Sequence, residues 1–309
     1  MYTNLFLLST SIKNKVLSIQ KNIKQLTKNH MNNINIKNII LCMVREAITI
    51  IQQECHELII EHKVAYNGTD EDFATNGDKK AQEMYVREIK QYFPGFGIIA
   101  EEENLRVPCT IPDQDIYFTL DPLDGTKAYK RKQSHGVGTM IALIRDGEIV
   151  AAYVGDANTG EIYGYCAVGE NPDKEGEVIR YRFGREITLK RNTEELLKDQ
   201  YLLLRDDPHM FRDLEKKFKN LEVAGGSIGT HMARLWKGEV GATMLEPNYQ
   251  TPWDLAPVLG ITNRLGYVFL KINPQNGNLE KYLPHPIKEI EHKNYYELIV
   301  HKAYEKELI

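Results

Sequence analysis

The feature that most constrains this chain is the hexapeptide Asp-Pro-Leu-Asp-Gly-Thr at residues 121–126, directly after the apolar run 116–120. The apolar run predicts a short buried strand. Proline holds Asp121 extended, and Gly125 permits a tight turn, so that Asp121 and Asp124 can face one point. Two carboxylates held this close repel each other, and a hard divalent cation removes the conflict. Although the same residue types also form ordinary turns, the hexapeptide predicts an oxygen-ligand metal site, which favours Mg²⁺ over Zn²⁺.

Backbone groups of the same hexapeptide extend this prediction. The Leu123 carbonyl lies between the two aspartates in the sequence and can add a metal ligand. Beyond the turn, the amides of Gly125 and Thr126 are candidates to hold a phosphate group, since unpaired backbone N–H groups bind anions.

Two further acidic positions strengthen the metal hypothesis. A run of three glutamates, 101–103, closes another short apolar run at 96–100, and Glu101 precedes Asp121 by twenty residues. Alone, a triple Glu is more typical of a solvated surface. Later, Trp-Asp-Leu-Ala-Pro at 253–257 opens a predicted helix with Asp254 as its N-cap. Both positions have a simple structural interpretation, and they gain weight only in combination with residues 121–126.

The remaining pattern predicts mixed helices and strands. A long amphipathic helix is expected from Ile36 to Ile59, and a second helix from Asp78 to Tyr92. Sheet and helix then alternate, which predicts stacked layers. The further expected strands are 137–144, 148–155, 161–168, 201–204, 221–224, 240–245, 267–271 and 296–301, and the further expected helices are 208–218, 229–237 and 253–265.

Composition sets the broad class. With 309 residues, 42% hydrophobic and 27% charged, the chain can form one large domain or two packed lobes. The net charge of −4 gives no reason to expect a nucleic-acid polymer as partner. No apolar run is long enough to span a bilayer. Four scattered cysteines without CxxC spacing favour reduced thiols and a cytoplasmic location.

The ordered set of motifs resembles the inositol monophosphatase superfamily of metal-dependent phosphatases. That family has Asp-Pro-x-Asp-Gly-Thr as its first signature and Trp-Asp-x-Ala as its second. Between them lies a Gly-Ser-x-Gly-like loop, matched here by residues 226–230, and an upstream Thr-Asp-like element matches residues 76–78. The resemblance covers roughly residue 36 to the C-terminus. It implies an α+β fold, a five-layered αβαβα sandwich, with lithium sensitivity and often a homodimer.

The predicted domain organisation follows from the same match. Residues 1–35, rich in Lys, Asn and Ile, are expected to be either a loosely docked helix or an extension ahead of a start at Met31. Residues 36–309 are expected to form the catalytic domain. It would divide into an N-terminal α+β lobe, about 36–190, and a C-terminal α/β lobe, about 191–309.

Carried over residue by residue, the resemblance implies a site for two or three Mg²⁺ ions and a small phosphorylated substrate. The implied metal ligands are Glu101, Asp121, the Leu123 carbonyl, Asp124 and Asp254. Thr126, supported by Asp78 and Glu101, would orient the attacking water in an in-line hydrolysis. The implied substrate contacts are Asp124, Gly125, Thr126, Gly229, His231 and Glu246. For His231 the alternative is a histidine on the surface of a helix.

The sequence leaves the substrate open. Inositol 1-phosphate is the first candidate and 3'-phosphoadenosine 5'-phosphate the second, because Asp-Pro-Leu-Asp-Gly-Thr-Lys is typical of relatives that act on the nucleotide. Lys127 would then bind a second phosphate or remain solvated. Ala256-Pro257 is closer to histidinol-phosphate relatives, and a sugar bisphosphate also stays open. A non-catalytic binding member of the fold is the alternative from a different class.

Overall fold

The computed structural model describes residues 36–63, 72–168, 176–190, 193–205, 211–273 and 275–308. The predicted extension at 1–35 and the first residues of the helix predicted at 208–218 lie outside this part of the chain. The chain divides into two compact units, residues 1–39 and 40–309, and the description below concerns the second. Within the described residues, no helix combines the length and the apolar character needed to cross a bilayer.

Two helices precede the first large sheet. Helix α2 spans Ile36–Glu54 and α3 spans Asn76–Tyr92. The prediction that the first helix continues to Ile59 is wrong, because the chain forms a 3₁₀ turn after Glu54 and leaves Ile59 62% exposed. The Asn76 side chain stabilises this departure: it donates to the Glu57 carbonyl at 3.0 Å and accepts from the Ile59 amide at 2.9 Å. A short antiparallel pair follows, β1 (Ile60–Lys63) with β2 (Asp72–Thr75).

The first large sheet has eight strands in the order β10-β9-β8-β7-β6-β5-β3-β4. Strands β3 and β5 are parallel, and the other neighbours are antiparallel. All nine residues of β5 are buried, as its apolar run predicts. The strands are β3 (Gly97–Ala100), β4 (Arg106–Val107), β5 (Ile116–Asp124), β6 (Gly138–Arg145), β7 (Glu148–Asp156), β8 (Ile162–Cys166), β9 (Ile179–Arg182) and β10 (Arg185–Thr188).

The second large sheet has six strands in the order β12-β11-β13-β18-β15-β16. Strand β11 is parallel to both β12 and β13, and the remaining neighbours are antiparallel. The strands are β11 (Tyr201–Leu204), β12 (Asn220–Val223), β13 (Ala242–Leu245), β15 (Tyr267–Ile272), β16 (Leu279–Tyr282) and β18 (Tyr296–His301). A separate pair, β14 (Asn248–Gln250) with β17 (Glu291–Lys293), lies between β13 and β18 in the sequence.

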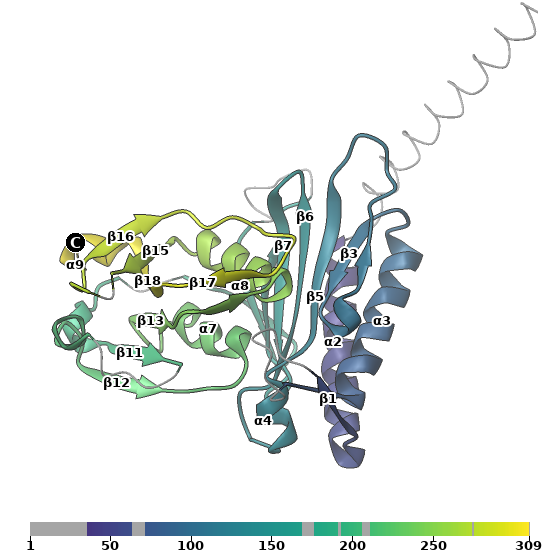
Figure 1. The fold of residues 1–309 in the computed structure, drawn as a ribbon, viewed down its shortest axis with the longest axis horizontal. Helices are drawn as coiled ribbons and strands as arrows, with labels where there is room; N and C mark the ends of the chain where they lie inside the picture. The colour runs from purple at the N-terminus through teal and green to yellow at the C-terminus, as the bar shows by residue number, and fades with distance from the viewer. Residues whose placement is uncertain are drawn as a thin grey trace, which may run out of the picture. The chain divides into compact units, whose positions relative to one another are not determined.

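The two sheets enclose a helical layer, as Figure 1 shows. Helix α7 (Ile228–Trp236) contacts β6, β7 and β13, and α8 (Pro252–Arg264) contacts β5, β6, β7 and β15. Val44 and Ile48 of α2 pack against Gly155 of β7 on the other face of the first sheet. The short helix α6 (Arg212–Glu215) lies between β11 and β12 in the sequence, and α9 (Glu305–Leu308) follows β18. The arrangement is the predicted α+β fold with five layers.

One core dominates the packing of these layers. It joins Met140 and Val154 of the first sheet, Trp236 and Leu259 of the middle helices, and Ile299 of the second sheet, all of them buried. At about 25 cal/mol per Å² of apolar surface, burial of such large side chains supplies most of the free energy that favours folding. Trp253 and Ala256 at the start of α8 belong to this core, and α8 packs against β5.

Candidate metal centre

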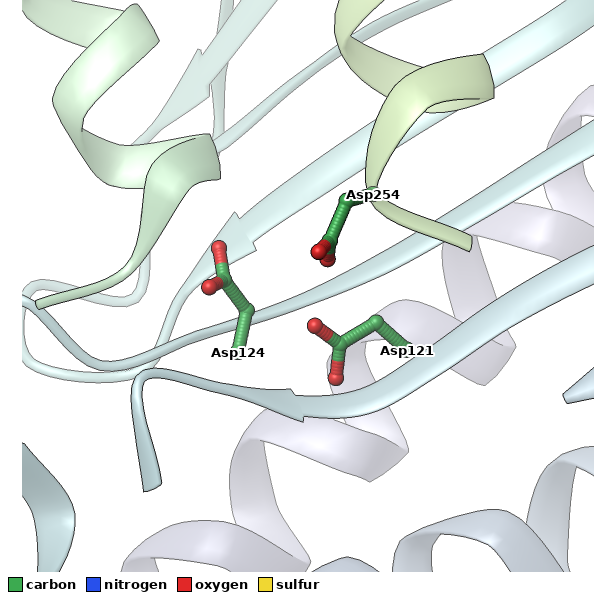
Figure 2. Close-up of side chains that lie close together, drawn as sticks. All are labelled: Asp121, Asp124 and Asp254. Carbon is green, nitrogen blue, oxygen red and sulfur yellow. The ribbon is translucent and has the colours of Figure 1, made fainter. Parts of the chain in front are cut away.

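Three aspartates converge where β5 ends and α8 begins. Asp121 and Asp124 lie in the last four residues of β5, and Asp254 lies in the first turn of α8. Each offers a carboxylate oxygen, and the three oxygens lie within 4.8 Å of one another. Figure 2 shows the three carboxyl groups gathered in one space. The structure thus brings together three residues predicted from separate motifs, close enough for one cation to contact all three.

A bulge at the end of β5 brings the two strand aspartates to the same side. Asp121 pairs with Met140, whereas Asp124 pairs with Gly138, so β5 carries one extra residue across this interval. The Leu123 amide donates to Asp121 Oδ1 at 3.0 Å, which fixes the turn through Pro122. In a regular strand, residues three apart point to opposite faces. The bulge therefore brings Asp121 and Asp124 to the same side, an effect attributed to Pro122 and Gly125 from the sequence alone.

Gly125 is required for the chain to leave this site. Its φ is +93°, and a Cβ there would lie 2.2 Å from the Gly136 carbonyl oxygen and 2.8 Å from the Ser227 amide nitrogen. Only glycine fits so close an approach in the left-handed region. The short helix α4 (Thr126–Lys130) begins directly afterwards.

Asp124 is held by the N-terminus of α7. Its carboxylate accepts from Ser227 Oγ at 2.5 Å, from the Ile228 amide at 3.0 Å and from the Gly229 amide at 2.7 Å. Ser227 is the N-cap of α7, and its Oγ accepts from the Thr230 amide. The first turn of a helix favours an anion at this point. The loop predicted to contact substrate thus also fixes a metal-ligand candidate, and Gly229 does so through its backbone.

Asp254 is not the N-cap that the sequence predicts. The N-cap of α8 is Thr251, whose Oγ1 accepts from the Asp254 amide at 3.2 Å, with Pro252 in the first turn. Proline is favoured at this position because its missing N–H is not needed there. Asp254 is consequently the third residue of the helix, from which its side chain reaches toward Asp121 (Figure 2).

Glu101 follows β3 and lies beside a lysine. Lys63 Nζ is 3.8 Å from Glu101 Oε1 and forms a closer ion pair with Glu102. Glu102 is buried rather than solvated, and its backbone exchanges two hydrogen bonds with the Gln82 side chain. The triple glutamate is therefore not a plain surface run. Glu101 acts electrostatically on both Asp121 and Asp254, although the three-residue cluster at the centre does not include it.

Thr126 connects the centre to helix α3. Its hydroxyl lies 3.2 Å from Asp78 Oδ1 and 3.2 Å from the Leu123 carbonyl oxygen, and its single proton can serve one of them at a time. Asp78 is completely buried and accepts at Oδ2 from both the amide and the hydroxyl of Thr75, the N-cap of α3. The predicted Thr126–Asp78 contact is present, and the described contacts of Thr126 do not include one with Glu101.

The charges of the site call for a cation. Burial raises the pKa of Asp121 well above its ordinary value, and the charges of Glu101, Asp124 and Asp254 raise it further. Burial and the charge of Asp124 raise the pKa of Asp254 to about 6. Burial likewise raises the pKa of Glu101, against the opposing charge of Lys63. A divalent cation would reverse these shifts, and an all-oxygen donor set suits Mg²⁺, Ca²⁺ or Mn²⁺.

His231 lies neither on the surface nor in an open pocket. The residue is 4% exposed; Nδ1 lies 3.0 Å from the Ala224 carbonyl oxygen and Nε2 lies 2.6 Å from Thr243 Oγ1. The alternative of a helix-surface histidine is therefore wrong. Both ring nitrogens are occupied by protein, which disfavours the predicted substrate contact.

Two charged residues directly follow strands of the second sheet: Glu246, which was predicted from the sequence, and Arg205, which was missed. Glu246 follows β13, is half-buried, and raises the pKa of the Tyr296 hydroxyl through its charge after the effect of burial. Arg205 follows β11; burial raises the pKa values of Asp124 and Asp254, and the positive charge of Arg205 opposes this rise. Arg205 carries no motif signal. A usable signal was its place directly after an apolar strand.

Comparisons with known proteins agree with this geometry. The model of the inositol monophosphatase family matches residues 35–307. The inositol-1-monophosphatase of Bacillus subtilis is 24% identical over 239 residues, covering 74% of this chain and 82% of that protein. The Nus factor SuhB of Xylella fastidiosa is 29% identical over 126 residues, and that of Escherichia coli K12 is 33% identical over 92 residues. These alignments with SuhB span 43% and 33% of the two proteins, and 41% and 30% of this chain.

Solved structures share the fold. An IMPase/NADP phosphatase in complex with NADP and Ca²⁺ superposes with a TM-score of 0.67 at 20% identity, covering 88% of this chain and 93% of that one. A staphylococcal IMPase in complex with products gives a TM-score of 0.65, with the same identity and coverage.

Proposed function

The chain belongs to the inositol monophosphatase family, and from that premise we propose that it is a metal-dependent phosphomonoesterase acting on a small phosphate monoester. The observation that carries the proposal is the convergence of Asp121, Asp124 and Asp254 within 4.8 Å, next to the Thr126–Asp78 pair. In this proposal the aspartates would hold the cation and the Thr126 hydroxyl would orient the nucleophile.

Five groups would hold Mg²⁺ in this proposal, two or three ions in all. They are the carboxylates of Glu101, Asp121, Asp124 and Asp254 and the carbonyl of Leu123. The bound metal would neutralise charge on the phosphate and lower the pKa of a bound water. A related structure of an IMPase/NADP phosphatase contains Mg²⁺ and phosphate. That structure supports the choice of metal through the shared fold.

The protein's own contribution is to position the attacking water and the phosphate. When the Thr126 hydroxyl donates to Asp78 or to the Leu123 carbonyl, its oxygen can still accept a hydrogen bond from a water. Asp78 fixes the threonine rotamer and can share the proton that the water releases. Glu101 would assist from the end of β3. The amides of Gly125 and Thr126 are the proposed phosphate donors, with no covalent enzyme intermediate required.

The substrate candidates are inositol 1-phosphate and a phosphate ester with a second charged group, such as 3'-phosphoadenosine 5'-phosphate. Structures with this fold have been solved with D-inositol-1-phosphate and with NADP. Both kinds of ligand are therefore compatible with the fold. The competing proposal is that this chain has a non-catalytic binding role. It is retained because the SuhB relatives are described as Nus factors.

The test is phosphate release with and without Mg²⁺, and with added lithium, from inositol 1-phosphate, 3'-phosphoadenosine 5'-phosphate, histidinol phosphate and fructose 1,6-bisphosphate. Asp121→Asn is expected to lower kcat by about 10³-fold or more, because it removes a charge from the cation site. Asp113→Asn is the matched control: Asp113 is exposed, and Asn tolerates its φ of +57°. Full activity of Asp121→Asn, or no Mg²⁺ requirement, would refute the proposal.

A further inference from the structure

Arg205 directly follows β11 of the second sheet, and its charge acts on Asp124 and Asp254 of the candidate metal centre. Strands β11 and β13 are parallel, with Leu204 level with Met244. Carried one residue further, this register places Arg205 level with Leu245, and Leu245 pairs with Glu297 of β18. The carboxyl ends of adjacent parallel strands are where open sheets commonly bind ligands. Arg205 and Glu246 are the residues that directly follow these two strands.

A direct chain of contacts links Arg205 to a candidate metal ligand. Arg205 Nη2 donates to the Gly226 carbonyl at 2.7 Å. The next residue, Ser227, donates through Oγ to Asp124 at 2.5 Å. The guanidinium charge also acts on both Asp124 and Asp254, whose pKa values it lowers against the larger effect of burial. Its positive charge therefore lies close to the place where the phosphate ester would be bound.

The guanidinium keeps binding capacity after this contact. It has five N–H donors in a planar fork that matches phosphate oxygens, and the Gly226 carbonyl accepts from Nη2 alone. Among residues placed by the structure, no carboxylate lies within 4.0 Å of Arg205. The nearby Lys293 differs: it is 5% exposed, and its Nζ is 3.8 Å from Glu297 Oε2. Lys293 thus has a buried counter-charge, whereas Arg205 is half-buried and lacks one in this part of the chain.

We propose that Arg205 binds a second phosphate group of the substrate, so that the preferred substrate is a phosphate ester carrying another phosphate rather than an ester of a neutral polyol. The proposal rests on the proposed phosphatase function and names its substrate class. The ester phosphate would lie at the three aspartates and Thr126. The second phosphate would lie at the edge of the second sheet, where Arg205 offsets the negative charge of the metal-binding carboxylates.

The competing explanation is that Arg205 only supports the loop at 225–227. Such a role would affect every substrate equally, because the loop holds Asp124 regardless of what is bound. A comparison of two substrates that differ by one phosphate separates these explanations. Effects common to both substrates, including altered metal affinity or lower stability, cancel in the ratio of their kcat/KM values.

The experiment measures kcat/KM at saturating Mg²⁺ for two matched pairs. One pair is 3'-phosphoadenosine 5'-phosphate with adenosine 3'-phosphate, and the other is fructose 1,6-bisphosphate with fructose 1-phosphate. In the wild type, at least one pair should favour the bisphosphate by about 10-fold or more, as expected for charge-assisted hydrogen bonds. In Arg205→Met this ratio should fall toward one, and Arg205→Lys should retain part of it. Arg264→Met is the matched control, because Arg264 is exposed at the far end of α8 and lies over the Tyr165 ring.

The outcomes separate the two proposals. If the wild type hydrolyses p-nitrophenyl phosphate but neither pair shows a preference, or Arg205→Met keeps the wild-type ratio, the assignment of Arg205 is overturned and the phosphatase proposal stands. If no monoester is hydrolysed with Mg²⁺, the phosphatase proposal itself is overturned, and the Arg205 assignment with it. A ratio that falls in Arg205→Met and stays unchanged in Arg264→Met supports the assignment.

Discussion

Acidification should destabilise this protein through His231, a buried histidine outside the proposed metal ligands. Burial, with the charges of Arg205 and Arg234, lowers the pKa of His231 from 6.5 to about 3, although its hydrogen bond to Ala224 opposes the change. A carbonyl oxygen only accepts, so Nδ1 carries the proton that bonds to Ala224. In the neutral ring Nε2 can accept from Thr243 Oγ1, whose hydroxyl also lies 3.1 Å from the Leu203 carbonyl oxygen. In the protonated ring Nε2 would instead donate to Thr243 Oγ1, so the cost of protonation is mainly that of burying the charge.

The sign and size of the effect follow from the two pKa values. The folded state keeps His231 neutral, whereas the unfolded state binds a proton below pH 6.5. The free energy of unfolding is therefore unaffected by His231 above pH 6.5 and decreases as the pH falls from 6.5 toward about 3. At 1.36 kcal/mol per pKa unit, the loss is about 2 kcal/mol at pH 5 and approaches about 5 kcal/mol at pH 3. The figure at pH 5 is best measured as a difference between variants, because Asp254, with a pKa of about 6, also titrates between pH 7 and pH 5 without metal.

The assay is urea unfolding at pH 7, 6 and 5 with EDTA, followed by the fluorescence of the buried Trp236 and Trp253. His231→Gln keeps a donor and an acceptor but cannot take up the proton, so its free energy of unfolding should fall by about 2 kcal/mol less than that of the wild type between pH 7 and pH 5. His135→Gln, at an exposed histidine, should follow the wild type.

Parallel loss of stability in wild type and His231→Gln would refute this reasoning. A second measurement covers a variant that folds poorly. In the wild-type protein, the ring resonances of His231 should keep their neutral positions in NMR spectra down to about pH 4.5, well above the pKa. A titration midpoint near pH 6 would contradict the buried, doubly bonded ring.

Three further predictions test the site and its supports. Gly125→Ala should cost about 3 kcal/mol or more in urea unfolding, because it adds a clash with the Gly136 carbonyl to a φ of +93°; Gly147→Ala, at φ +83° with no neighbour within 4 Å, should cost only about 1 kcal/mol. Thr126→Val should lower kcat by about 10²-fold with little change in KM, and Thr126→Ser should restore most of it; equal effects on kcat from both variants would contradict the role of the hydroxyl. Mg²⁺ at 100 times its Kd should raise the free energy of unfolding by about 2.7 kcal/mol in calorimetry, and a gain as large in Asp121→Asn would exclude the proposed site.

The sequence predicted the strands that carry the site because they are buried on both faces. β3, β5 and β6 are continuous apolar runs, and the predicted spans differ from the structure by a few residues. Edge and peripheral strands lack this signal. All four residues of β10 are exposed, and β1 and β16 have polar sequences without a clear period of two. Their existence depends on pairing with neighbours, which the local sequence does not encode.

Errors near the site placed helix boundaries three to five residues from their positions in the structure. Asp254 has the residue type of an N-cap, yet Thr251 lies three residues earlier and Pro252 marks the first turn. Ile59 continues the helical spacing of α2, but the Asn76 side chain bonds the backbone groups of Glu57 and Ile59 from the start of the next helix. In the first case the helix-start signal was present in the sequence as Thr251-Pro252. In the second it was a contact between residues 17 positions apart.

The rule that found Glu101 and Asp121 applies more widely than it was used. Glu101 directly follows the buried strand β3, and Asp121 directly follows the apolar run 116–120 within β5. Such positions commonly gather at one edge of a sheet. Arg205 and Glu246 stand in the same relation to β11 and β13. The two sheets turn these edges toward α7 and α8, whose first turns hold Asp124 and carry Asp254. An apolar strand followed at once by a charged residue is therefore the sequence signal for both the proposed metal ligands and the proposed second-phosphate contact. Arg205 is proposed as a substrate contact on the same grounds as Asp121 is proposed as a metal ligand.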